Sequence, residues 1–170
     1  MALHTYRATI DWSGSTGAGY DAYDRTHAAT SPPAQSPLTV SADPAFLGDS
    51  ACLNPEQLLV AAAASCQLLS FLAVAARARL DVVAYTDDAI ADMPEDDPPV
   101  RITRIDLRPT ITFADTDRPR PSPERLAHLV EVAHRECYVA NSLRSEITVA
   151  PAFRWLENPF EVDDEGAIDR

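Results

Sequence analysis

A long apolar helix over residues 54–79 constrains the fold of this chain more than any other stretch. Asn54 suits the N-cap, because its side-chain oxygen can accept from a backbone N–H two or three residues further on. Pro55 then occupies the first helical position, where its missing N–H costs nothing. Gln57 can reach back to the cap and complete a capping-box-like pair. From residue 58 to 76 nearly every side chain is apolar or small. A helix that is apolar all round belongs inside a protein or inside a membrane.

The membrane alternative must be weighed because about 18 apolar residues are enough to span a bilayer. The run is rich in alanine rather than leucine, and it carries Ser65, Gln67 and Ser70 near its centre. No basic cluster or aromatic belt marks its start. The sequence therefore favours the central core helix of a soluble protein.

Composition narrows the class of protein. The 170 residues suit one domain, which we expect over residues 1–156, with an acidic C-terminal extension over residues 157–170. A formal net charge of −12 argues against nucleic acid and anionic membranes as partners, because both require basic surfaces. All 14 basic residues are arginines, so Schiff-base chemistry and a P-loop lysine are excluded. Residues 1–12 lack a signal pattern, which predicts a cytoplasmic protein.

The cysteines are few. Cys52, Cys66 and Cys137 are too scattered for the disulfide framework of a secreted domain. In a reducing compartment such cysteines are more often reactive or simply buried.

Alternating patterns predict the strands. Residues 4–12 alternate as a strand with one buried side, residues 20–27 can return as its hairpin partner, and residues 38–40 form a short edge strand. Beyond the helix we expect strands over residues 82–93, 100–113 and 147–155. The apolar parity within residues 100–113 changes, which a β-bulge near Thr103 or Arg104 would correct. Pro109 suggests an edge strand, or a strand whose N–H side is free at that point.

A second helix is expected to begin at Ser122 and Pro123, again a cap followed by proline. Its apolar residues fall at helical spacing on one face, which Cys137 shares, so this thiol should point inward. A short helical turn follows over residues 141–144. The expected order is therefore β-β-β-α-β-β-α-α-β. Segregated strands and helices of this kind indicate the α+β class.

A cysteine in the middle of a buried helix is usually inert. Cys66 departs from that default because a second inward-facing cysteine, Cys137, lies on the other core helix, so the two thiols can meet. Glu56 in the first turn complements the helix dipole. It can alternatively orient an arginine.

Two motifs resemble those of the OsmC/Ohr family, the osmotically induced and organic-hydroperoxide-resistance proteins. The run Asn54-Pro55-Glu56-Gln57-Leu58 resembles the family's N-P-E-[EQ]-L motif, and Cys66 follows the glutamate by ten residues, where the family has its peroxidatic cysteine. The segment around Cys137 resembles the family's second cysteine motif, although Tyr138 stands where most members have proline. The resemblance extends from residue 6 to residue 153.

The resemblance implies an OsmC-like fold of two sheets around long central helices, in an intertwined homodimer. It also implies a peroxidase that needs no cofactor or metal. Cys66 attacks an organic hydroperoxide and becomes a sulfenic acid, Cys137 condenses with it to a disulfide, and an external dithiol such as a lipoyl protein reduces the product. Arg25 resembles the active-site arginine of the family's hairpin, and Glu56 would hold it.

The chemistry explains why such a constellation is needed. An ordinary thiol is only a few per cent thiolate at neutral pH, and only the thiolate attacks the O–O bond. Cys66 lies too far along its helix to benefit from the N-terminus, so a cation must stabilise its charge. An arginine can bind a carboxylate and still present donors to the peroxide. Arg25 can also be an ordinary surface residue of its strand.

Other functions stay open. Cys66 can pair with His27 or His134 in a cysteine hydrolase, and His134 with the two cysteines can form a zinc site. A third alternative is an OsmC-fold protein that binds a small ligand in an apolar interface cleft and lacks peroxidase activity. The resemblance gives Cys52 no role.

Overall fold

The computed structural model describes residues 3–156, and the expected C-terminal extension lies outside them. Contacts between Cα atoms divide the chain into two compact units, Met1–Leu59 and Val60–Arg170. The long helix α1 (Pro55–Arg77) begins in the first unit and continues into the second. The expected single domain over residues 1–156 stays a prediction.

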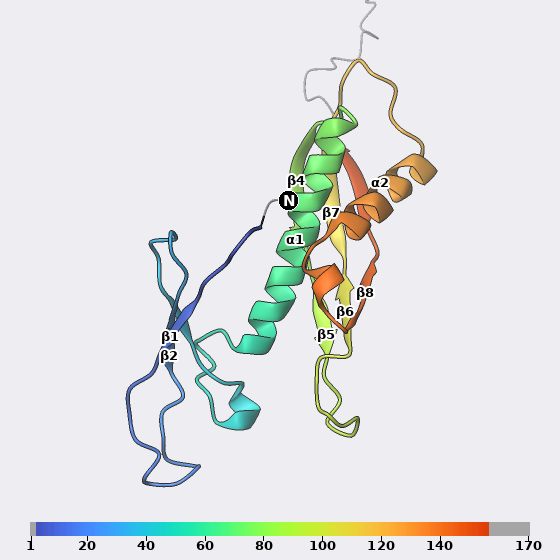
Figure 1. The fold of residues 1–170 in the computed structure, drawn as a ribbon. Coiled ribbons are helices and arrows are strands. Elements are labelled where there is room, and N and C mark those ends of the chain that lie inside the picture. The colour runs from blue at the N-terminus through green and yellow to red at the C-terminus, as the bar shows by residue number, and fades with distance from the viewer. Residues whose placement is uncertain (1–2, 157–170) are drawn as a thin grey trace, which may run out of the picture. The chain divides into compact units, whose positions relative to one another are not determined.

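The first unit contains a small antiparallel sheet in the order β1-β2-β3 (Figure 1). Its strands are β1 (Thr9–Asp11), β2 (His27–Thr30) and β3 (Leu38–Val40), and a 3-10 turn, η1 (Pro44–Phe46), follows. The strand expected over residues 38–40 is confirmed. The first strand is shorter than expected and has no buried side, and its partner begins only at His27, because residues 20–23 form turns.

The start of α1 matches the sequence prediction. The side-chain oxygen of Asn54 accepts from the Gln57 N–H at 2.7 Å, and the Gln57 side-chain oxygen accepts from the Asn54 N–H at 3.1 Å. This reciprocal pair is a capping box, and it satisfies two backbone donors at the helix terminus. The capping box fixes where the helix begins.

Helix α1 ends in a pair of backbone hydrogen bonds, without the glycine that often follows a helix. The Leu80 N–H donates to the Ala75 carbonyl at 2.9 Å, and the Arg79 N–H donates to the Ala76 carbonyl at 3.0 Å. Those two bonds form a Schellman motif, in which the residue after the cap adopts a left-handed conformation. Here that residue is Arg79, with φ of 61°. Glycine usually takes this position because it has no Cβ to clash.

Only one stripe of α1 is buried, contrary to the expectation of a helix enclosed all round. The buried residues share one side of the helix. Ala63, Gln67 and Phe71 are four positions apart, and Val74 and Ala75 follow Phe71 by three and four positions. The opposite side keeps apolar side chains exposed, among them Leu69 at 64% and Leu72 at 37%. Within residues 3–156, α1 is the one helix that is long and apolar enough to cross a membrane. Of its most apolar 18-residue window, 28% is buried.

Two mixed sheets lie in the second unit. One has the order β4-β7-β9 and the other β5-β6-β8, and in each the last pair of strands is parallel. The strands are β4 (Val82–Asp87), β5 (Ile90–Asp92), β6 (Arg104–Leu107), β7 (Pro109–Ala114), β8 (Glu146–Val149) and β9 (Ala152–Leu156).

Each of the three long strands predicted beyond α1 is divided in two. Breaks fall at Asp88, at Arg108 and at Pro151, so that each half joins a different sheet. The predicted bulge near Thr103 or Arg104 is wrong. Strand β6 begins only at Arg104, and from Ile105 to Phe113 every second side chain is buried without interruption. Pro109 is not on an edge strand, because β7 is central, but as first residue of β7 it interrupts no ladder.

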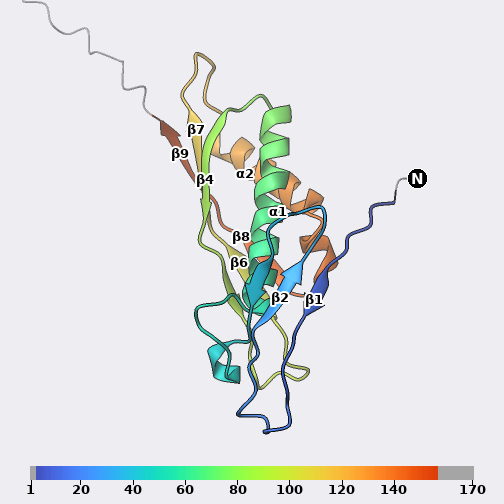
Figure 2. The same cartoon turned by 90° about the vertical axis from the view of Figure 1, so that its left-hand side faces the viewer.

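The second helix, α2 (Pro123–Glu136), starts as predicted, with the Ser122 hydroxyl accepting from the Arg125 N–H. Helices α1 and α2 cover one face of the β4-β7-β9 sheet (Figure 2). Their shared core contains Phe71, Val74 and Ala75 of α1, Ile111 and Phe113 of β7, and Leu126, Val130 and Ala133 of α2. A 3-10 turn, η2 (Ala140–Ser142), follows α2 one residue earlier than expected. Mixed α+β content is confirmed, with more and shorter strands than expected.

Replacing Arg79 by glycine should stabilise the protein. The substitution removes the Cβ from a left-handed position, and after the greater chain entropy of glycine is subtracted we expect a gain of about 0.5 to 1 kcal/mol in the free energy of unfolding. Urea denaturation measures it. Arg79→Ala is the matched control, because alanine keeps the Cβ and should give no gain. Equal stability of the two variants would contradict the argument.

Candidate active site

The structure brings Cys66 and Cys137 together in the second unit. Cys66 comes from the middle of α1, and Cys137 is the C-cap residue of α2. Both are free thiols, Cys66 partly exposed and Cys137 buried. The two thiols are close enough for Cys66 to act on the pKa of Cys137. The Cys66 sulfur also accepts from the Val139 N–H at 3.5 Å.

The turn that follows α2 places the Val139 N–H beside Cys66. Cys137 leaves the helical conformation with ψ of 107°, and its N–H donates to the His134 carbonyl at 3.1 Å. The Cys137 carbonyl then accepts from the Asn141 N–H at 3.0 Å, which closes the following turn. Within that turn the Val139 N–H donates to Cys66, whereas the Tyr138 side chain is 82% exposed.

Burial raises the pKa of the Cys137 thiol to about 11. The neighbouring Cys66 thiol acts in the same direction, and the backbone N–H of Ala140 acts against both. Cys137 is therefore a neutral thiol at physiological pH. It can donate its proton to a hydrogen bond but is a poor nucleophile in this state.

A cavity of about 380 Å³ opens beside Cys66. Cys66, Ser70, Ala73 and Arg77 form one stripe of α1 at helical spacing along it, and Leu69, Glu136 and Tyr138 complete the lining. Arg77 and Glu136 form an ion pair of 2.6 Å between α1 and α2. The cavity thus has a thiol, an apolar wall and a paired arginine.

Sequence reasoning did not assign Arg77 or Glu136 to the site. The signal was present, because Cys66, Ser70, Ala73 and Arg77 are spaced by four, three and four residues and must share a helix face. Glu136 directly precedes Cys137, so the thiol contact also brings its carboxylate near α1.

Arg25 and Glu56, the other two predicted site residues, lie in the first unit. The Arg25 guanidinium donates to the carbonyls of Tyr23 at 2.9 Å and Tyr20 at 2.8 Å, and it lies over both tyrosine rings at 4.0 and 4.7 Å. Within residues 3–156 it makes no ion pair with Glu56. Their catalytic roles stay predictions.

The two histidines considered for a hydrolase or a zinc site lie in different units. His27 Nδ1 lies 2.9 Å from the Arg25 carbonyl in the first unit. His134 Nδ1 is buried and has no hydrogen-bond partner among the described residues. Within residues 3–156 no three His, Cys, Asp or Glu side chains are grouped so that they would hold a metal ion. Cys52 is partly exposed in the first unit.

Alkylation should be slowest at Cys137. With a pKa of about 11, its thiolate fraction at pH 8 is about a hundredfold smaller than that of an ordinary thiol, and its rate should rise about tenfold for each pH unit up to about 11. Iodoacetamide labelling followed by peptide mass spectrometry measures each cysteine separately. The same residue in urea is the control. If Cys137 reacted equally fast in the folded and unfolded chains, burial would not protect this thiol and its raised pKa would be refuted.

Comparisons with known proteins agree with this architecture. A family model described as OsmC-like protein matches residues 48–151. An OsmC-like protein of unknown function from Vibrio cholerae shares 28% identity with a TM-score of 0.79, covering 88% of this chain and 99% of that one. None of the curated proteins matches the chain in sequence.

Two more distant structures are named as organic hydroperoxide resistance proteins. The one from Elizabethkingia anophelis has 20% identity and a TM-score of 0.64, covering 91% of this chain and 99% of that one. OhrB of Bacillus subtilis has 22% identity and a TM-score of 0.57, covering 90% of this chain and 100% of that one. At these identities the likeness shows the fold alone. The family model, which matches more than half of the sequence, shows that the chain belongs to the OsmC-like protein family.

Proposed function

We propose that the protein is a thiol-dependent peroxidase that reduces organic hydroperoxides in the cytoplasm. The observation that carries the proposal is the proximity of Cys66 and Cys137, two free thiols from different helices that interact closely enough to affect the pKa of Cys137. We expect the two to form a disulfide when Cys66 is oxidised. The family includes organic hydroperoxide resistance proteins, which supports this activity over others.

The reaction begins with the Cys66 thiolate. It attacks one peroxide oxygen, the O–O bond breaks, and the products are a Cys66 sulfenic acid and, after protonation, an alcohol. The Cys137 thiol then condenses with the sulfenic acid, which forms the disulfide and releases water. An external dithiol returns both cysteines to thiols by exchange and is itself oxidised to a disulfide.

The surroundings of Cys66 contain a backbone donor and the second thiol. The Val139 N–H donates to the Cys66 sulfur at 3.5 Å, and Cys137 interacts with Cys66. The same N–H can donate to the sulfur throughout the reaction. The high pKa of Cys137 keeps its proton in place until Cys66 has been oxidised.

Two arginines are candidates for positioning the peroxide. On the family resemblance we assign the role to Arg25, which Glu56 would hold, although the two form no ion pair within residues 3–156. Arg77, paired with Glu136, lines the same cavity as Cys66 but follows it by three turns of α1. At that distance along the helix Arg77 suits the remote end of a substrate better than the reacting oxygens.

Peroxide treatment should consume two of the three thiols. After one equivalent of cumene hydroperoxide we expect wild type to retain one free thiol and Cys66→Ser to retain both of its thiols. Cys137→Ser should stop at a sulfenic acid, which dimedone traps. A thiol reagent counts the remaining groups. If wild type kept all three thiols, the alternative of an OsmC-fold ligand-binding protein without peroxidase activity would replace this proposal.

Matched variants of Arg25 and Arg77 show which arginine positions the peroxide. Arg25→Gln should lower the second-order rate of peroxide reduction about a hundredfold, because it removes a donor to the developing charge. Arg77→Gln breaks an exposed ion pair and should change the rate toward cumene hydroperoxide by about twofold or less. Stopped-flow measurement of peroxide consumption gives both values. The reverse order of effects would transfer the positioning role to Arg77.

The exposed side of α1 supports a homodimer. Leu69, Leu72, Ala73 and Ala76 form an apolar stripe on that side, which an enclosed helix would bury. A second copy of the chain is the occupant that the family resemblance implies, and it would close the Cys66 cavity from outside.

Light scattering after size-exclusion chromatography should give the mass of a dimer for wild type. Leu72→Glu should convert it to a monomer, because a charge in an apolar interface is left without a partner. Val100→Glu, at an exposed valine outside this stripe, should leave the mass unchanged. A monomeric wild type would exclude the dimer.

A further inference from the structure

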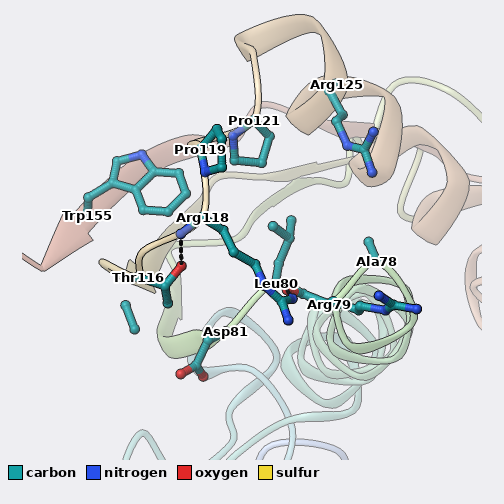
Figure 3. Close-up of a pocket in the computed structure, with 11 residues that line it drawn as sticks. Ala78, Arg79, Leu80, Asp81, Thr116, Arg118, Pro119, Pro121, Arg125 and Trp155 are labelled. Carbon is teal, nitrogen blue, oxygen red and sulfur yellow. Dashed lines mark hydrogen bonds between the residues drawn. The ribbon is translucent and has the colours of Figure 1, made fainter.

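A second cavity, of about 420 Å³, lies at the C-terminal end of α1 (Figure 3). It shares no lining residue with the Cys66 cavity. It is formed by the chain just beyond α1, the segment between β7 and α2, the start of α2, and Trp155 of β9. All of these belong to the second unit. Its volume lies within the range of small-molecule sites, roughly 300 to 1,000 Å³.

Three arginines line this cavity. Arg79 follows α1, Arg118 lies in the segment after β7, and Arg125 extends from α2 toward the end of α1 (Figure 3). None of the three makes an ion pair within residues 3–156. Among the described residues the Arg118 guanidinium donates only a long hydrogen bond, of 3.4 Å, to the Arg79 carbonyl. Among the residues that the structure describes, Asp81 is the only acidic one in the lining.

The backbone conformation at Arg79 is one that residues with a Cβ rarely adopt. An arginine in the left-handed position of a Schellman motif costs stability that glycine would not cost. Unlike glycine, the arginine at this position places a positive charge beside the cavity. Three guanidinium groups around one cavity also repel one another, and a bound anion would offset that repulsion.

The remaining wall is apolar and firmly held. Leu80, Pro119, Pro121 and Trp155 line it. The Trp155 ring stacks on the core residue Phe113 with centroids 4.9 Å apart and 29° between the planes. An aromatic side chain fixed in this way presents an edge or face to a ligand without moving.

We propose that this cavity binds a small phosphate monoester whose organic part is apolar or aromatic. A dianionic phosphate offers several oxygens to the three guanidinium groups, and guanidinium forks bind phosphate in bidentate fashion. A monocarboxylate carries half the charge and fewer acceptor oxygens. The apolar wall then selects an ester over inorganic phosphate. The site is independent of the peroxidase cysteines.

Calorimetric titration of the full chain with phenyl phosphate, at low salt and pH 7.5, tests the proposal. We expect saturable binding with a dissociation constant of about 10 µM to 1 mM, at least tenfold tighter than for inorganic phosphate or phenylacetate. Cys66→Ser should bind phenyl phosphate as wild type does, so the result does not depend on the proposed peroxidase activity.

Three variants locate the site. Arg118→Gln and Arg125→Gln should each weaken binding about tenfold, since each removes charge-assisted hydrogen bonds. Arg79→Gly should weaken it similarly although it is expected to unfold at higher urea concentration, so misfolding cannot explain its loss. Arg144→Gln, at an exposed arginine outside the cavity, makes the same charge change and should alter binding by less than about twofold. Absence of saturable binding, or an equal loss in Arg144→Gln, would overturn the proposal.

Discussion

The packing of one stripe of α1 against β7 and α2 is the interaction on which the second unit depends. Phe71 and Phe113 are both fully buried, and their rings lie 6.5 Å apart in an edge-on arrangement at the centre of the core. Because a helix repeats every 3.6 residues, fixing Phe71 against the sheet also fixes which side chains turn toward the end of α2. Cys66 lies on that side. The meeting of the two thiols is therefore a consequence of the core packing and not a separate feature of the fold.

The same packing leaves polar atoms in the interior that the described chain does not satisfy. The side-chain oxygen of Gln67, next to Cys66, is buried without a hydrogen-bond partner among the described residues, and so is the hydroxyl of Tyr85. Burial, with the Asp87 carboxylate acting in the same direction, raises the pKa of Tyr85. Its hydroxyl therefore stays neutral. Buried polar atoms of this kind are costly, and they gather near sites where a protein has chemistry to perform.

Local signals in the sequence were enough for the helices. Asn54 and Gln57 form the predicted capping box, and Ser122 caps α2, because a cap depends only on neighbours three residues away. The strands beyond α1 were harder to predict. Their apolar alternation continues through Arg108, yet the chain changes sheets there, and the change depends on which distant strands pair with each half. Pairing between β7 and β9 joins segments about 40 residues apart, which no local pattern specifies.

Site residues show the same division. The sequence predicted two inward-facing cysteines on different helices, and this was enough to predict that the two thiols can meet. It did not reveal the donor from Val139, because that contact depends on Cys137 leaving the helical conformation at the end of α2.

The end of α1 shows how a single turn divides the surface into two chemical environments. Arg77 still has helical geometry, so its side chain continues the stripe of Cys66 and pairs with Glu136. Two residues later Arg79 has passed into the left-handed conformation, and its side chain lines the other cavity instead. Had the helix continued, Arg79 would lie about 160° around the axis from Arg77, in a direction set by the helical repeat and not by the turn. The Schellman motif thus separates a thiol cavity, whose arginine is neutralised by a partner, from a cavity whose arginines are not paired among the described residues.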